Sequence, residues 1–117
     1  MIYGVIGDIH SNYDALTAVV RSLQEEKVDR VLCVGDIVGY AAEPAPCIDL
    51  VHDLNCVFVA GNHDYAAVGK FPADYFHYDA RSAIMWTIKN LTQGDLDFLR
   101  NMPLIEELDD ITIVHGS

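Results

Sequence analysis

The stretch VFVAGNHDYAAVG, residues 57–69, joins an apolar run directly to an amide, an imidazole and a carboxylate. The run is short, apolar and rich in valine, which predicts a buried strand. Asn62, His63 and Asp64 follow at its end, although such polar groups are costly to bury without partners. This arrangement indicates that the three side chains have a use beyond packing.

Two earlier runs end in the same way. IYGVI, residues 2–6, is followed by a glycine and Asp8, and RVLCV, residues 30–34, is followed by a glycine and Asp36. Together with residues 56–60, these runs predict three buried strands.

Helical patterns separate the predicted strands. Between the first two strands, apolar residues recur at helical spacing, and Ser11 with Asp14 forms an expected capping box. Residues 43–54 predict a shorter helix with prolines in its first turn. Alternating strands and helices predict an α/β fold with a parallel sheet and right-handed crossovers.

The pattern changes after Gly69. An aromatic, irregular segment comes first, and residues 79–91 and 92–102 then predict two helices, the second capped by Thr92. Residues 103–117 predict two strands joined by a two-residue turn at Asp109 and Asp110.

Length and composition favour one packed domain over residues 1–117. Hydrophobic residues make up 51% of the chain against 21% charged, which argues against disorder. The net charge is −11 with only 7 Lys and Arg, so a polyanionic nucleic-acid partner is disfavoured and a nuclease is the weakest enzyme hypothesis.

The three cysteines, Cys33, Cys47 and Cys56, lie in or near apolar segments without a Cys-x-x-Cys spacing. They predict reduced core residues and a cytoplasmic location. The N-terminus has no basic leader, and no apolar run reaches the ~20 residues that a bilayer requires, so we expect a soluble chain without a membrane segment.

The polar residues at the strand ends are expected to meet in one crevice. In an open parallel sheet, the residues just past the carboxyl ends of the strands surround the ligand. These residues are Asp8, His10, Asp36, Asn62 and His63. Taken alone, an aspartate after a strand is more often a turn or cap residue, but three groups in phase favour a shared site.

The mixture of oxygen and imidazole donors suits Mn, Fe, Co, Ni or Zn better than Ca or Mg. The set is too rich for a single catalytic zinc with an open position, so a two-metal centre fits better. Two divalent ions would make the site positive within a strongly negative molecule.

These motifs resemble the calcineurin-like metallophosphoesterase family. Asp8-Ile-His10, Gly35-Asp36 and Gly61-Asn62-His63-Asp64 occur in the family's order, and IVHGS supplies its next block at His115. GDIHSNYDAL and GDIVGYAAEP are most similar to its small prokaryotic branch. The resemblance implies a β-sandwich flanked by helices, an αββα fold.

The resemblance also implies site roles. Asp8 and His10 would bind one metal ion, Asp36 would bridge two, and Asn62 and His115 would bind the second. His63 would contact the substrate and protonate the leaving oxygen while a hydroxide held between the metals attacks phosphorus. The implied function is hydrolysis of phosphomonoesters or phosphodiesters of small molecules or nucleotides, with manganese the favoured metal.

Two departures from the family pattern qualify this implication. Gly39 and Tyr40 stand where the Ser/Thr protein phosphatases have Asp-Arg, which argues against protein phosphatase activity. The family's Gly-His-x-His block, which supplies further ligands, does not occur before Ser117. We therefore expect an N-terminal portion of the domain, incomplete in its second sheet, that binds metal weakly and associates through the uncovered sheet.

Several residues keep more than one interpretation. Tyr40 is a weaker candidate for substrate contact, alongside Asn62 and His63. The aromatic residues of the irregular segment either form a wall for an organic group or pack in the core. Asp64 either assists His63 or caps the next turn. His52 is expected on the surface or in packing, and Trp86 in the core. His77 could reach the site from the aromatic segment, but a structural role is favoured. The alternative function is a catalytically impaired metal-binding or protein-binding module, as in the retromer subunit of this fold.

Overall fold

Three short strands pair in parallel, as the alternation of strands and helices predicts. The structure, a computed structural model, describes residues 1–116. The sheet has the order β1 (Tyr3–Ile6), β2 (Arg30–Cys33), β3 (Val57–Phe58). Its register places Ile6 beside Cys33 and Cys33 beside Phe58. The three strands therefore end at the same level, and the loops that follow them start from one edge.

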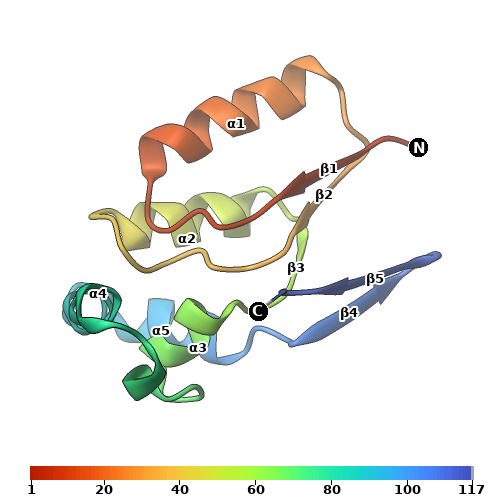
Figure 1. The fold of residues 1–117 in the computed structure, drawn as a ribbon. Coiled ribbons are helices and arrows are strands. Elements are labelled where there is room, and N and C mark those ends of the chain that lie inside the picture. Colours follow the sequence, from red (N-terminus) through yellow and green to blue (C-terminus); the bar gives the residue numbers. More distant parts are fainter. Residues whose placement is uncertain (117) are drawn as a thin grey trace.

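Two helices cover one face of this sheet (Figure 1). They are α1 (Tyr13–Glu25) and α2 (Pro44–Asp53). Leu16 and Val20 of α1 pack in the same core cluster as Ile6 of β1. The helical pattern of the sequence correctly predicts both helices.

The cap of α1 differs from the prediction. Asn12 is the N-cap, and its side chain accepts a hydrogen bond from the Ala15 N–H at 3.1 Å. Ser11 is instead buried, because its N–H donates to the Ile37 carbonyl at 2.9 Å and ties this residue to the loop after β2. The prediction that Ser11 caps α1 is wrong because a tertiary contact fixes its backbone.

The opposite face carries a hairpin of β4 (Ile105–Leu108) and β5 (Ile111–Val114). Leu108 pairs with Ile111, which confirms the two-residue turn. Ile113 packs against Leu32 and Val59 in a second core cluster. The hairpin thus forms the second layer of the mixed α/β fold.

The remaining helices lie near the carboxyl ends of the strands (Figure 1). They are α3 (Asn62–Ala67), the 3-10 turn η1 (Ala73–Tyr75), α4 (Tyr78–Lys89) and α5 (Gln93–Arg100). Thr92 caps α5 as predicted, since its side chain accepts from the Asp95 N–H at 3.1 Å. Trp86 is 43% exposed, so its prediction as a core residue is wrong, because α4 packs through its opposite side at Ile84 and Thr87.

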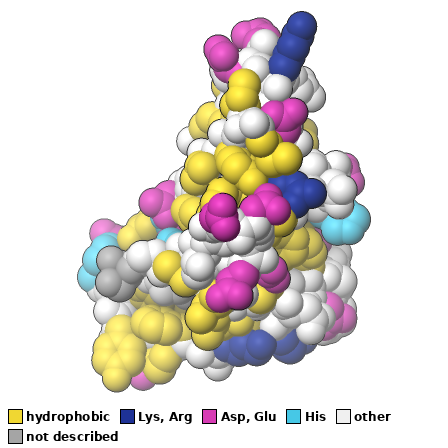
Figure 2. Space-filling view, turned by 90° about the vertical axis from the view of Figure 1, so that its right-hand side faces the viewer, with side chains coloured by type: hydrophobic (Ala, Val, Ile, Leu, Met, Phe, Trp, Pro, Cys, Tyr) yellow, Lys and Arg dark blue, Asp and Glu magenta, His cyan; other side chains and the backbone are white. Residues whose placement is uncertain are grey.

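The hairpin leaves part of the sheet uncovered. Val5 pairs with the buried Leu32 yet is 64% exposed. The hairpin contacts β1 at Tyr3, whose hydroxyl donates to the Asp109 carboxylate at 2.8 Å, and leaves Val5 uncovered. Ile105 and Val114 point away from the sheet and are also exposed. Figure 2 shows hydrophobic side chains among acidic ones on the face that carries the N-terminus and the hairpin tip.

The three cysteines are free thiols, and Cys33 and Cys47 are fully buried. Burial raises the pKa of both thiols to about 12. They are core residues, as the sequence predicts. Within residues 1–116, every helix is too short or too polar to cross a bilayer.

Candidate metal centre

The loops that follow the three parallel strands meet in one open pocket. The loops after β1 and β2 are tied together, because the Asp8 N–H donates to the Gly35 carbonyl at 3.0 Å and the His10 N–H donates to the Asp36 carbonyl at 2.9 Å. The residue that follows β5 reaches the same place. The pocket, of about 470 Å³, contains all six predicted site residues and Tyr40: Asp8, His10, Asp36, Tyr40, Asn62, His63 and His115.

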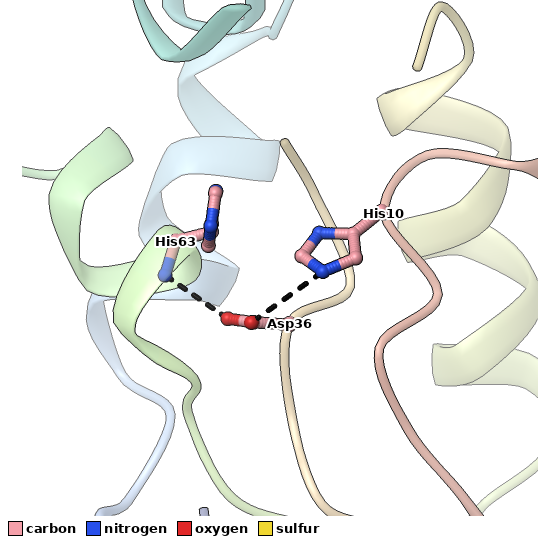
Figure 3. A group of neighbouring side chains, drawn as sticks. All are labelled: His10, Asp36 and His63. Atoms are coloured by element: carbon pink, nitrogen blue, oxygen red, sulfur yellow. Dashed lines mark hydrogen bonds and ion pairs between the residues drawn. The ribbon is translucent and has the colours of Figure 1, made fainter. Parts of the chain in front are cut away.

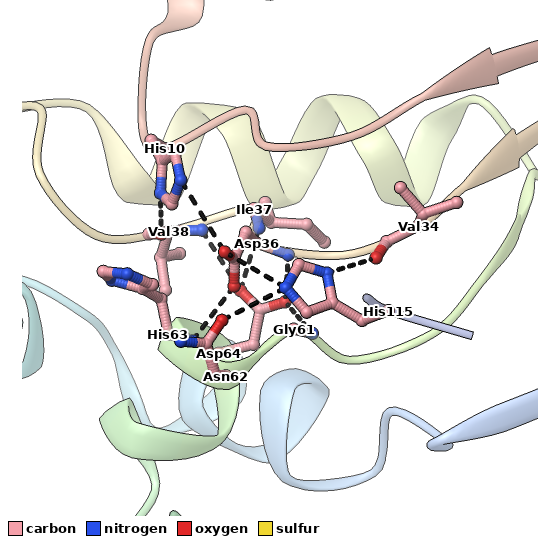
Figure 4. A network of polar contacts seen from close by, with 10 residues as sticks. All are labelled: His10, Val34, Asp36, Ile37, Val38, Gly61, Asn62, His63, Asp64 and His115. Carbon is pink, nitrogen blue, oxygen red and sulfur yellow. Dashed lines mark hydrogen bonds and ion pairs between the residues drawn. The ribbon is translucent and has the colours of Figure 1, made fainter. Parts of the chain in front are cut away.

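Two of the histidines have their orientation fixed by backbone carbonyls (Figure 4). The Nδ1–H of His10 donates to the Val38 carbonyl at 3.2 Å, and that of His115 donates to the Val34 carbonyl at 2.7 Å. A carbonyl only accepts, so Nδ1 carries the proton and the lone pair of the neutral ring lies on Nε2. Histidines that bind metals are typically held in this way.

Both Nε2 atoms face the same carboxylate oxygen. Oδ2 of Asp36 lies 3.6 Å from Nε2 of His10 and 3.4 Å from Nε2 of His115. Asp36 is 4% exposed, so water screens these groups weakly. Acceptor atoms that face one another are unfavourable without a hydrogen-bond donor or a cation between them.

The positions of the donors fit metal ions. Ligand atoms of Asp8, Asp36 and His115 lie within 4.8 Å of one another, and those of His10, Asp36 and His63 form a second such group. Asp36 belongs to both groups, as a bridging ligand would. Figure 3 shows the His10 ring turned toward Asp36, whereas His63 contacts this carboxylate through its backbone N–H. Nitrogen and oxygen donors of this kind suit divalent transition metals.

The Asn62 amide completes this arrangement. With its nitrogen facing inward, it donates to His115 Nε2 at 3.1 Å and to the two Asp36 carboxylate oxygens at 3.2 and 3.3 Å. This orientation agrees with a lone pair on His115 Nε2. Rotation of the amide by half a turn would present its oxygen to a cation at the same point.

His63 has a different environment from the other two histidines. Its backbone N–H donates to Asp36 Oδ1 at 3.0 Å, while its ring lies against three other rings, those of His10, Tyr40 and Phe76. Its Nδ1 is buried without a hydrogen-bond partner, so no carbonyl fixes its tautomer. Burial, the largest effect, lowers the pKa of His63 below its usual value.

Gly39 provides the space for this ring. A Cβ at Gly39 would lie 2.5 Å from His63 Nδ1, and its φ of +96° is a conformation that side chains rarely adopt. The glycine at the position where the protein phosphatases have aspartate therefore allows His63 to lie against the backbone.

Asp64 is fully buried and accepts hydrogen bonds from four backbone N–H groups. Its carboxylate caps α3 and also binds the loop after β2. The sequence left open whether Asp64 caps this turn or assists His63. Burial raises the pKa of Asp64 to about 7, whereas the N–H donors favour the ionised form. The sequence signal for this role is limited to the position of Asp64 three residues after Gly61, as in a capping box.

The aromatic segment contributes to the site only in part. Tyr40 is 50% exposed, and its ring centroid lies 4.9 Å from that of His63. Phe76 also contacts His63, whereas Tyr75 and Tyr78 are 80% and 73% exposed. The core interpretation of these last two tyrosines is wrong because they lie on the outer surface near the start of α4.

The other two histidines lie outside the pocket. His52 is exposed on α2 and approaches the Asp53 carboxylate at 3.5 Å. His77 is exposed at the N-cap of α4. The surface position predicted for His52 is confirmed, and the structural role of His77 stays a prediction.

The site loops contain an unusual amount of left-handed backbone. Five of the eight described non-glycine residues with positive φ lie there: Asp8, His10, Ser11, Asp36 and Tyr40. Each such residue costs about 1–2 kcal/mol. Backbone strain of this kind persists where the surrounding contacts hold it, and it concentrates at functional sites.

The chain belongs to the calcineurin-like phosphoesterase family, whose model matches residues 1–117. It is 48% identical over 103 residues to the uncharacterized protein MJ0912 of Methanocaldococcus jannaschii, a match that covers 88% of this chain and 42% of the relative. A crystal structure of a metallophosphoesterase from Sphaerobacter thermophilus superimposes with a TM-score of 0.82 at 39% identity, over 100% of this chain and 47% of that one.

A more distant neighbour shares the fold. The crystal structure of "a putative diadenosine tetraphosphatase" matches with a TM-score of 0.75 at 18% identity, over 99% of this chain and 55% of that one. The chain thus spans about half the length of the relatives that it matches.

Replacing Gly61 should disturb the site through sterics alone. A Cβ at Gly61 would collide with the backbone nitrogen and the carboxylate of Asp36. We expect Gly61→Ala to lower the free energy of unfolding by about 1–3 kcal/mol. Gly94→Ala on α5 is the control, since the nearest atom to a Cβ at Gly94 is Thr92 Oγ1 at 3.8 Å and alanine favours helix by up to about 1 kcal/mol. Urea denaturation measures both, and equal effects would contradict the close approach.

Proposed function

We propose that the chain carries a dinuclear metal centre for the hydrolysis of phosphoesters. The observation that supports this most directly is the convergence of two Nε2 lone pairs on one buried carboxylate oxygen of Asp36. Such a set of acceptors is unfavourable by itself and becomes favourable around cations. Membership of the calcineurin-like phosphoesterase family supports the reaction class.

The proposed ligands follow the family pattern. Asp8 and His10 would hold one ion, Asp36 would hold both, and Asn62 and His115 would hold the other. The presence of Asp36 in both groups of neighbouring ligand atoms supports its role as the bridge. The carboxylate of Asp8 also lies within reach of His115, so its assignment to the first ion rests on the family pattern.

Divalent ions in this position lower the pKa of bound water and stabilise negative charge on phosphate oxygens. The chain's own residues supply the rest. His63 donates a proton to the leaving oxygen, and a bound phosphoester favours the protonated imidazole against the effect of burial. Manganese is the proposed metal, with iron, zinc, nickel or cobalt as alternatives.

The proposed substrates are small-molecule phosphoesters, including nucleotides. The net charge of −11 and two carboxylates in the pocket repel free phosphate, so binding depends on the cations. Tyr40 offers a half-exposed ring beside His63 on which an organic group can stack. The description of one structural neighbour as a diadenosine tetraphosphatase supports a nucleotide.

His63→Ala tests the proton donor. We expect turnover of a chromogenic phosphodiester with added Mn²⁺ to fall about 100-fold or more, because general acid catalysis typically contributes this much. Metal content by elemental analysis should stay the same, since His63 is not among the proposed metal ligands. His52→Ala on α2 is the control and should be fully active. Unchanged turnover in His63→Ala would remove this residue from the mechanism.

Asp36→Asn tests the metal centre directly. The amide removes the negative charge and one acceptor from the point where both histidines converge, so we expect Mn²⁺ affinity by calorimetry to fall more than tenfold. Asp53→Asn, on the exposed surface of α2, should leave affinity unchanged. Equal affinity in both variants would show that the pocket is not the metal site.

The alternative is a binding module of the same fold, with self-association as its simplest form. Two paired apolar residues support it, since Ile105 and Val114 are 59% and 51% exposed on the outer side of the hairpin. Ile105→Lys should then reduce association in sedimentation velocity. A monomeric parent chain with Mn²⁺-dependent turnover would exclude this alternative.

A further inference from the structure

The carboxylate of Asp64 connects the loops that carry the proposed metal ligands. Its Oδ1 accepts from the N–H groups of Ile37 at 2.9 Å and Val38 at 3.1 Å, and its Oδ2 accepts from those of Asp36 and Gly61, both at 2.9 Å. Figure 4 shows this side chain within the polar network, among Asp36, Gly61 and His63. Each oxygen therefore has two donors, and the carboxylate is fully buried.

These bonds act on groups that hold the ligands. Asp36 has a φ of 57°, and the bond from its N–H to Asp64 holds this left-handed conformation. Its own Oδ1 then accepts from the His63 N–H at 3.0 Å. The two carboxylates thus each hold the backbone of the other's loop.

The same bonds reach His10. The Val38 N–H donates to Asp64, and the Val38 carbonyl accepts from His10 Nδ1. Asp64 therefore holds the residue whose carbonyl orients the His10 ring and leaves its Nε2 free to bind a metal. On the other loop, the bond from the Gly61 N–H fixes the residue just before Asn62.

Helix capping alone does not explain this set of contacts. Asp95 has the same capping position in α5, where its carboxylate accepts from the Thr92 N–H at 3.1 Å. Only one of the four Asp64 bonds, that from Gly61, corresponds to this contact. The other three come from the loop after β2, at 26 to 28 residues' distance in sequence.

We propose that Asp64 is the positioning residue of the metal centre and does not itself bind metal. It orients Asp36 through the Asp36 N–H, Asn62 through the preceding Gly61, and His10 through Val38. The effect that we expect on metal affinity rests on the proposed function. Its structural part, the connection between the loops, is independent of that function.

Asp64→Asn tests the consequence. In either orientation the amide NH₂ faces two backbone N–H donors, so two of the four bonds are lost and two donors are left opposed. We expect the dissociation constant for Mn²⁺, measured by calorimetry, to rise at least tenfold. Asp95→Asn makes the same chemical change at a helix cap outside the site and should alter the constant by less than twofold. Equal effects of the two variants would overturn the proposal.

Amide hydrogen exchange of the wild-type protein tests the connection itself. The four donor amides, at Asp36, Ile37, Val38 and Gly61, should exchange as slowly as that of Leu32 in β2, although they lie outside the strands. Exchange as fast as at the exposed Asp110 would overturn the proposal. Because this measurement uses the wild-type protein, it remains decisive if the Asp64→Asn variant does not fold. If the wild-type chain binds no Mn²⁺, the proposed function is wrong, and slow exchange would still establish the role of Asp64 in joining the loops.

Discussion

The register of the three parallel strands is the constraint on which the site depends. Because Ile6, Cys33 and Phe58 lie side by side, the chain leaves all three strands at one level. Pairing continues beyond the strands, since the His10 N–H donates to the Asp36 carbonyl. A slip of one residue in any strand would turn its apolar side chains to the other face and carry the proposed ligands away from one another. Burial of the apolar faces of β1 and β2 therefore also sets the geometry of a polar site.

The site is locally unfavourable, and the rest of the fold holds it in place. Acceptor atoms face one another around Asp36, five residues of the loops have left-handed backbone, and a fully buried carboxylate lies beneath them. Each of these features costs stability when considered alone. The two hydrophobic clusters on either side of the sheet supply the compensating free energy. Conflict concentrated at one edge of an otherwise well-packed sheet is typical of a functional site.

The sequence predicts the parts of this structure whose causes are local. Periodicity and β-branched runs predict β1, β2, α1, α2 and the hairpin, and the spacing of the strand ends predicts which residues gather. It cannot predict contacts that depend on distant backbone: Ser11 is held by Ile37, and Asp64 by the loop after β2. It also overstates the core, because Trp86 and Tyr75 are hydrophobic by type while the outer side of α4 and the turn before it leave them exposed. Local pattern shows which residues are available, and tertiary packing decides which of them are buried.

His115 makes the site dependent on both layers of the fold. It follows β5, yet its ring donates to the Val34 carbonyl, 81 residues earlier in the chain. The hairpin that carries it is held against the sheet by a small cluster around Ile113, Leu32 and Val59. A two-stranded hairpin is only marginally stable by itself, so docking through this cluster determines how often His115 occupies its position. A cation bound by His115 and Asp36 would favour the docked state over the undocked one, by the same linkage that couples any ligand to the conformation that binds it. The docking of the hairpin against the sheet and the affinity of the proposed centre for a cation would therefore be two measures of one equilibrium.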